Sequence, residues 1–267
     1  MCESVDPDEP CGPPGESHVA DSWSTLGRGF SRRSLLLAAP VAAGVAVSMP
    51  AGTAHARAVP LRIYRGNRSR REVALSFDAG ADRGNAEGIL DLLGEHGITA
   101  SFGMTGPWVR RNPDLAQRVA NEGHHLINHS MTHRSFVRGG PGGRALTRRE
   151  CFWELDQADA VYQEIMGVSS KPWFRPPFLA LTWRGAQDCA DRGYDHIAMC
   201  TRDSLGWKRI PKQYVIERCV GVAANGASMM FHVGKASTDF RALPGVIAGI
   251  AGRGFRMVSV KDIVRVE

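Results

Sequence analysis

From residue 73 onward, short apolar stretches alternate with longer segments in which apolar residues recur at the spacing of a helix. The apolar stretches have the length of buried strands, and they fall at residues 73–77, 98–103, 125–128, 172–175, 195–200, 227–231 and 255–260. Strands that alternate with helices in this way form a parallel sheet. We therefore expect an α/β fold of the parallel, barrel-like type.

Glycine and capping residues indicate where the helices begin and end. The first three helices are expected to end at Gly97, Gly123 and Gly167. The third of them is expected to begin at Thr147, which forms a capping-box pattern with Glu150. These boundaries leave nearly every predicted strand followed by a helix.

Polar residues suited to catalysis stand at or just after the ends of several predicted strands. They are Asp78, His129, Arg175, Asp203 and His232. In a barrel of parallel strands the carboxyl ends of the strands meet at one rim, where the active site lies. We therefore predict an active site at that rim, formed by these side chains.

The N-terminal part of the chain differs from the rest. Residues 1–27 are rich in Pro, Gly, Ser and acids, as disordered segments are. The pair Arg32-Arg33 then precedes an apolar run, and residues 54–56 have the small-x-small pattern of a cleavage site. Paired arginines of this kind are typical of a twin-arginine signal peptide, although an uncleaved anchor helix has a similar pattern. We predict a leader over residues 1–56, export of the folded protein, and a catalytic domain over residues 57–267.

Composition and charge narrow the range of partners. With 43% hydrophobic and 22% charged residues, the chain can bury a core. Residues 57–267 hold 30 basic and 21 acidic residues, a net charge of +9, which suits an anionic surface such as cell-wall polymer. They contain no basic stripe interleaved with aromatics and no apolar run of about 20 residues. We expect a monomer with no nucleic-acid partner and no membrane span in the mature chain.

Four cysteines follow the leader, at Cys151, Cys189, Cys200 and Cys219, and their spacings match no CxxC metal pattern. In an exported protein they can form one or two disulfides. Buried thiols on helix faces fit the same spacings, so both alternatives stay open at this point.

His129 and His133 are four residues apart, a spacing that directs two imidazoles at one point on a helical turn or a tight loop. Such a pair suits a divalent metal ion with one more protein ligand, for which Asp78, Asp82 and their neighbours are the candidates. Two imidazoles and a carboxylate with an open position are typical of hydrolytic metal sites. The alternative is that His129 and His133 are unrelated surface histidines, since such pairs often have the same spacing.

The remaining polar residues suit acid and base catalysis. Asp78 can accept a proton from water, and His232 can donate one to a leaving group, because imidazole titrates near neutral pH. Asp203 is the candidate for a carboxylate that hydrogen-bonds His232 and favours its charged form. Arg175 can pair with Asp78 and keep it ionised. A structural salt bridge for Arg175 and a core position for His232 are the alternatives.

The order of these groups resembles that of the polysaccharide deacetylases of carbohydrate esterase family four, the NodB-homology domain. The segments that carry the resemblance are Ser76-Phe77-Asp78-Ala79-Gly80, His129-Ser130-Met131-Thr132-His133, Arg175-Pro176-Pro177-Phe178, Asp203-Ser204-Leu205-Gly206-Trp207 and Met230-Phe231-His232. The resemblance implies a distorted (β/α)7-type barrel, with its active site at the C-terminal strand ends. It also implies hydrolysis of N-acetyl, or sometimes O-acetyl, groups on a sugar polymer.

The resemblance further implies a role for each polar residue. Asp78 is the base, supported by Arg175, and His232 is the acid, tuned by Asp203. The implied candidates for contact with the substrate are Pro176, Phe178, Trp207 and Phe231.

The resemblance also implies a divalent metal ion, commonly zinc, on His129 and His133. The sequence departs from the family pattern at Ala79, where the family has a metal-binding Asp, because a methyl group cannot bind a metal. Asp82 is the tentative replacement. A second departure is Gly206, where the family often has Asp, and it concerns contacts with the substrate.

We predict an exported, metal-dependent deacetylase that acts on an acetylated cell-wall or chitin-type glycan. One alternative is a C–N hydrolase of a small amide or imide, which the export signal disfavours. Another is a non-catalytic glycan-binding relative with a degraded metal site. Retention of Asp78, Arg175, Asp203 and His232 argues against the second alternative.

Overall fold

The computed structural model describes residues 60–80, 82–137 and 144–265 of the 267-residue chain. The predicted leader over residues 1–56, with its cleavage site, lies outside the described residues. Within the described part of the chain, no helix has both the length and the apolar character needed to cross a membrane.

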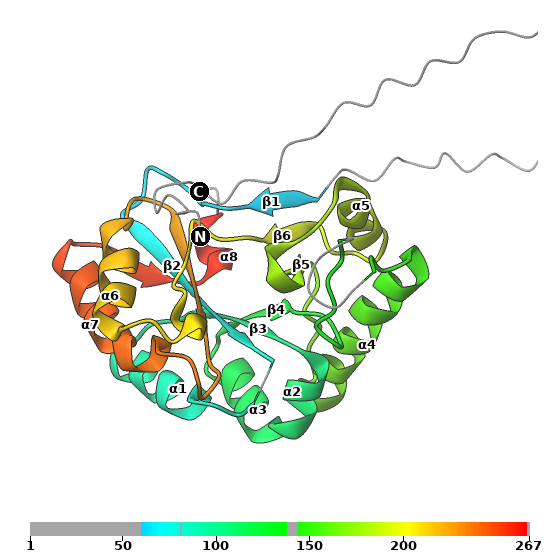
Figure 1. Cartoon of the computed structure of the whole chain (residues 1–267), viewed down its shortest axis with the longest axis horizontal. Helices are drawn as coiled ribbons and strands as arrows, with labels where there is room; N and C mark the ends of the chain where they lie inside the picture. The colour runs from blue at the N-terminus through cyan, green and yellow to red at the C-terminus, as the bar shows by residue number, and fades with distance from the viewer. Residues whose placement is uncertain (1–59, 81, 138–143, 266–267) are drawn as a thin grey trace, which may run out of the picture. The chain divides into compact units, whose positions relative to one another are not determined.

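Parallel strands form one sheet that curls into a half-barrel, with helices packed outside it (Figure 1). The strands are β1 (Leu61–Ile63), β2 (Glu72–Ala79), β3 (Ser101–Met104), β4 (His125–Asn128), β5 (Trp173–Phe174), β6 (His196–Ala198), β7 (Arg202–Asp203), β8 (Ala227–His232) and β9 (Arg256–Val258). Their order in the sheet is β1-β6-β5-β4-β3-β2-β8-β7, and β9 pairs with β2. All of these pairings are parallel, so the predicted α/β barrel-type fold is confirmed.

The helices follow the strands as the sequence predicts. They are α1 (Ala86–Glu95), α2 (Gly106–Arg111), α3 (Pro113–Asn121), α4 (Arg148–Met166), α5 (Trp183–Asp191), α6 (Lys212–Gly221), α7 (Asp239–Gly252) and α8 (Val260–Ile263), with the 3-10 turns η1 (Pro177–Leu179) and η2 (Gly206–Lys208). The capping box of Thr147 and Glu150 is present at the start of α4, and Gly167 ends this helix in the left-handed conformation. The sequence pattern does not predict β1, β7, α2 or α8, because elements of so few residues show no clear periodicity.

Strand β2 pairs with β3, β8 and β9, and every one of its residues is buried. Phe77 stacks between Phe102 of β3 and Phe231 of β8, with ring centroids 5.3 and 5.5 Å apart. Neighbouring residues of a strand face opposite sides of the sheet, so Asp78 points to the inner side of the half-barrel while Phe77 faces the helices. The aromatic stack therefore fixes the strand that carries Asp78 into the site.

The four cysteines of the described residues are buried thiols. Cys151 of α4 and Cys189 of α5 lie in one apolar cluster between these helices and the sheet. Burial raises the pKa of the Cys151 thiol to about 12. Of the two alternatives that the sequence leaves open, the structure supports buried thiols.

Candidate active site

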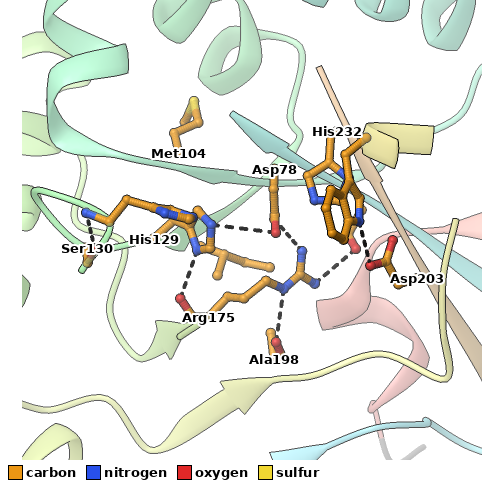
Figure 2. Close-up of polar contacts among 12 residues, drawn as sticks. Asp78, Met104, His129, Ser130, Arg175, Ala198, Asp203 and His232 are labelled. Atoms are coloured by element: carbon orange, nitrogen blue, oxygen red, sulfur yellow. Dashed lines mark hydrogen bonds and ion pairs between the residues drawn. The ribbon is translucent and has the colours of Figure 1, made fainter. Parts of the chain in front are cut away.

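Asp78 and Arg175 form a buried ion pair at the carboxyl ends of β2 and β5 (Figure 2). Nη1 of Arg175 donates to Oδ1 of Asp78 at 2.6 Å, and Nη2 donates to Oγ of Ser76 at 2.9 Å. Nε donates to the carbonyl oxygen of Ala198 at 3.0 Å, so all three guanidinium nitrogens have partners. The guanidinium is thereby fixed in place, and it fixes the carboxylate of Asp78 in turn.

The charge of Arg175 decides the protonation state of Asp78. Burial acts to raise the pKa of this carboxyl, but Arg175, with further help from His129 and His232, lowers the pKa below its usual value. Asp78 is therefore ionised at neutral pH. Arg175 occupies Oδ1, so Oδ2 is the oxygen that can accept a proton.

His129 follows β4 and lies on the other side of Asp78 from His232 in the view of Figure 2. Its Nδ1 donates to the carbonyl oxygen of Arg175 at 2.9 Å, because a carbonyl group can only accept. Its Nε2 then carries the lone pair, 3.6 Å from Oδ2 of Asp78. Burial lowers the pKa of His129, so the ring is neutral and its free lone pair faces the site.

The His129–His133 segment is a tight loop. The two imidazole rings meet edge to face, with centroids 4.8 Å apart. Oγ of Ser130 accepts from the backbone N–H of His133 at 3.0 Å, and the buried carboxylate of Glu154 accepts from the backbone N–H of Thr132 at 2.7 Å. The structure therefore brings the two imidazoles into contact, and their convergence on a metal ion stays a prediction.

His232 ends β8 and is the register partner of Asp78 on β2. The residue that contacts it is Asp239, at the start of α7. Oδ2 of Asp239 accepts from the backbone N–H of His232 at 2.8 Å and lies 3.6 Å from its Nδ1. Burial acts to lower the pKa of His232, but the contact with Asp239 and the charges of Asp78 and Asp203 outweigh it and raise the pKa.

The predicted hydrogen bond from Asp203 to His232 is replaced by other contacts. Oδ1 of Asp203 accepts from the backbone N–H of Leu205 at 2.9 Å, and Oδ2 accepts from Nε1 of Trp207 at 3.0 Å. Asp203 therefore holds the turn that carries Trp207, while its charge still acts on His232. Sequence reasoning missed Asp239, because an acid in the first turn of a helix is an ordinary helix-stabilising feature.

Gly206 makes room for Asp239. A Cβ atom at position 206 would overlap Oδ1 of the Asp239 carboxylate. The resemblance expects Asp at position 206. In this chain the carboxylate of Asp239, from α7, fills the space that a side chain at position 206 would occupy. The departure at Gly206 therefore concerns the acid side of the site as well as the substrate.

Six non-glycine residues of the described chain have positive φ angles, and they all fall in the loops around this site. They are Ser130, His133, Phe178, Leu179, Leu205 and Arg209. Each left-handed L-residue costs on the order of 1–2 kcal/mol, so surrounding contacts must hold it. Strain of this kind gathers at functional sites, and here it marks the three loops that follow β4, β5 and β7.

The four candidates for substrate contact divide into two groups. Trp207 and Phe178 are 49% and 46% exposed, beside His232 and His133 respectively. Phe231 is buried in the core against Phe77, and Pro176 is buried as well. The structure therefore leaves Trp207 and Phe178 as the aromatic surfaces open to a sugar. Strand alternation could have shown that Phe231 and His232 face opposite sides.

Residues 65–197 match the family model for polysaccharide deacetylase. The chain carries a polysaccharide deacetylase domain. Proteins of this family are hydrolases that act on N-acetyl C–N bonds. The matched residues include Asp78, His129 and Arg175, whereas Asp203 and His232 follow them in the chain.

Relatives and solved structures agree with the family. The chain is 27% identical over 205 residues to the uncharacterized protein YlxY of Bacillus subtilis, covering 77% of this chain and 61% of that protein. It is 26% identical over 207 residues to the B. subtilis peptidoglycan-N-acetylmuramic acid deacetylase PdaA, covering 75% of this chain and 74% of that protein. The PdaA structure matches with a TM-score of 0.67 and 25% identity over 75% of this chain and 83% of that chain.

A Bacillus anthracis pseudoenzyme of carbohydrate esterase family four shares the fold of the deacetylase domain. It matches with a TM-score of 0.68 and 23% identity, over 77% of this chain and 69% of that chain. A likeness at this identity shows the fold and leaves the chemistry to the residues of the site.

The family is generally metal-dependent, so the deacetylase domain must be tested for a metal site. The imidazoles of His129 and His133, kept neutral by burial, lie edge to face with centroids 4.8 Å apart. Oδ1 of Asp82 instead accepts from the backbone N–H of Lys235 at 3.0 Å, and Ala79 lies in an apolar cluster. Among the described residues, no group of three His, Cys, Asp or Glu side chains is arranged to hold a metal ion. The residues present therefore do not fit a complete metal site.

Proposed function

We propose that this protein is an exported hydrolase that removes N-acetyl groups from an acetylated cell-wall or chitin-type glycan, with Asp78 as base and His232 as acid. The observation that carries the proposal is the pairing of Asp78 and His232 on neighbouring strands. Arg175 keeps Asp78 negatively charged, and Asp239 favours the positively charged form of His232. A proton acceptor and a proton donor are thus held side by side.

The base step begins with water near Oδ2 of Asp78. Water attacks the carbonyl carbon of the acetamide group while Asp78 takes one of its protons. A new C–O bond forms, and the C=O bond becomes a single bond to a negatively charged oxygen. The ion pair with Arg175 is rigid, so the accepting oxygen needs little reorganisation in this step.

The acid step completes the reaction at His232. Its Nδ1 faces Asp239, so Nε2 is the nitrogen that donates a proton to the amine of the sugar. The C–N bond breaks, the carbonyl group re-forms, and acetate and the free amine leave. His129 and His133 offer two donors to the zinc ion that the resemblance implies, but no third, so we assign these steps to the protein's own groups.

The substrate class is supported by the relatives and by the charge of the chain. PdaA acts on peptidoglycan N-acetylmuramic acid, and other relatives are peptidoglycan-N-acetylglucosamine and chitooligosaccharide deacetylases. The proposed mature chain has a net charge of +9, which favours an anionic cell-wall polymer. The twin-arginine-like leader supports export to that compartment.

Acetate release from peptidoglycan and from chitin oligomers tests the proposal, with added zinc and with chelator in parallel. We expect release by the wild type and a loss of about 10²–10⁴-fold in Asp78→Asn, because the base is gone. The variant Asp82→Asn is the matched control, since Asp82 contacts Lys235 away from the imidazole pair. Wild-type activity in Asp78→Asn, or no release under any metal condition, would contradict the proposal.

A non-catalytic glycan-binding function is the second candidate. It is favoured by one observation, the lack of a third metal-binding side chain among the described residues. It predicts that the protein binds the glycan and releases no acetate, with or without zinc. The same experiment, read together with a glycan pull-down, separates the two functions.

A further inference from the structure

Next to the turn that carries Trp207 there is a pocket of about 400 Å³ at the N-terminal ends of α6 and α7. It is lined by Arg209, Ile210, Pro211, Lys212, Thr238 and Arg241. Half of these residues are cations and none is an acid. The pocket therefore has a positive charge and a small apolar wall.

The three cations of this pocket have no acidic partner among the described residues. Several other arginines of the described chain form ion pairs with Asp or Glu, for example Arg118 on α3 and Arg148 on α4. In contrast, no ion pair within the described ranges includes Arg209, Lys212 or Arg241. The three cations are exposed, and like charges gathered around one hollow attract an anion.

Thr238 adds an independent sign of a ligand. This residue is 1% exposed, lines the pocket, and precedes α7, yet its Oγ1 has no hydrogen-bond partner. A buried hydroxyl without a partner is costly, and Thr at this position normally caps the helix, which it does not do here. An oxygen atom of a bound anion would give the hydroxyl a partner.

We propose that this pocket binds an anionic group, a carboxylate or a phosphate, carried by the glycan next to the acetylated sugar. The proposal rests on the proposed function. The position fits, because Arg209 follows the exposed Trp207 by two residues and Thr238 precedes Asp239, which contacts His232. Guanidinium and hydroxyl groups are suited to carboxylate and phosphate oxygens. The enzyme therefore prefers acidic wall glycan to neutral chitin-type glycan.

The test measures binding by calorimetry in the full-length Asp78→Asn variant, so that affinity is measured without turnover. The probes are peptidoglycan glycan oligomers with free carboxylates, the same oligomers as methyl esters, phosphorylated chitin oligomers, and plain chitin oligomers of equal length. We expect the free carboxylates to bind roughly tenfold more tightly than the esters at low salt, since each partly exposed charge contributes about two- to fivefold. High salt should remove the difference.

Matched variants assign the preference to the pocket. Replacing Arg209 and Arg241 together by Gln should abolish the preference for free carboxylates over esters. Replacing Arg149 on α4 and Arg184 on α5 together by Gln removes the same amount of charge and should leave the preference for free carboxylates unchanged. Thr238→Val should weaken binding of the free carboxylates without lowering thermal stability, because the hydroxyl has no partner in the protein.

The outcomes separate this inference from the proposed function. Two results would overturn the anion-binding role of the pocket. One is equal affinity for free carboxylates and methyl esters in Asp78→Asn with the pocket unchanged, and the other is a preference for free carboxylates that survives replacement of Arg209 and Arg241. Neither result affects the test of the proposed function, because acetate release is measured separately. A charge preference that depends on these arginines supports the pocket even if no glycan yields acetate. Tighter binding of phosphorylated chitin than of carboxylated oligomers identifies phosphate as the anion.

Discussion

The two halves of the site are built differently. The base half, around Asp78, Arg175 and His129, is buried and fastened by hydrogen bonds between strand ends. The acid half combines His232 at the end of β8 with the exposed Trp207 on a loop and Asp239 at the start of α7, so it is more open. Groups on strand ends of a packed sheet hardly move, whereas loop and helix-end contacts can be exchanged. The base half is therefore the more rigid part of the site. The chain departs from the family pattern in both halves, at Ala79 beside the base and at Gly206 beside the acid.

Breaking the base half should have the largest effect. Arg175→Met removes the only cation that is hydrogen-bonded to Asp78 among the described residues and leaves a buried carboxylate. We expect a loss of about 3–5 kcal/mol in the free energy of unfolding at neutral pH, measured by urea denaturation. The pKa of Asp78 is lowered in the folded state, so the ion pair stabilises the protein above the ordinary carboxyl pKa and is lost as pH falls through the lowered value.

The pH series provides the control for this variant. The gap between wild type and Arg175→Met should narrow as the solution becomes acidic, since both proteins then carry a protonated Asp78. A gap that is constant from neutral to acidic pH would mean that Arg175 stabilises the fold by packing alone.

In the acid half, Asp239→Asn should change the pH profile of kcat/KM. His232 must be protonated to act, so activity is lost as pH rises through its raised pKa. Removing the charge of Asp239 should move this alkaline limb down by about one pH unit, while the acidic limb set by Asp78 stays in place.

Asp203→Asn is the comparison for that profile. Its carboxylate is bonded to the turn of Trp207, so it should shift the alkaline limb less than Asp239→Asn does and weaken substrate binding more. A larger shift from Asp203 than from Asp239 would return the role to Asp203, as the sequence alone predicts.

Gly206→Ala sharpens the comparison with a smaller loss of stability. The added methyl group overlaps the carboxylate of Asp239, and overpacking of this kind costs about 1–3 kcal/mol in stability. In an Asp239→Ala background the same change should cost much less, because the obstructing carboxylate is gone. Equal costs in both backgrounds, in a double-mutant cycle by thermal unfolding, would show that the two positions are independent.

The smallest expected effect is the response of Ala79→Asp to zinc. Ala79 ends β2 in an apolar cluster, next to Gly80, where an added Cβ atom would lie 4.0 Å from Cδ2 of His133. An aspartate at position 79 should lower the melting temperature in chelator, because its charge is buried. The resemblance places a metal-binding aspartate at position 79, so zinc should recover more stability in this variant than in wild type. The same zinc response in both proteins would exclude position 79 as a ligand position.

The fold and the base half could be predicted from the sequence because both depend on strands. Apolar strands of four to six residues are recognisable, and a polar residue at the end of one has a defined place on the rim. Asp78, Arg175 and His129 are therefore found together as expected. The same alternation, applied to Phe231, would have placed that ring in the core.

Asp239 could not be found in this way. Its role depends on the space above Gly206, a relation between two segments that are 33 positions apart and share no strand pairing. Asp82 shows the reverse error, because a carboxylate close in sequence to the site turns instead to the backbone of Lys235. Distance along the chain is a poor guide where loops, and not strands, carry the side chains.

The fit of the Asp239 carboxylate over Gly206 also limits how this protein can change over generations. A side chain at position 206 destabilises the protein while Asp239 is present. Loss of Asp239 removes the carboxylate beside His232 while position 206 is glycine. A lineage that moves the carboxylate from one segment to the other must therefore pass through a chain that has neither carboxylate or a chain in which the two side chains overlap.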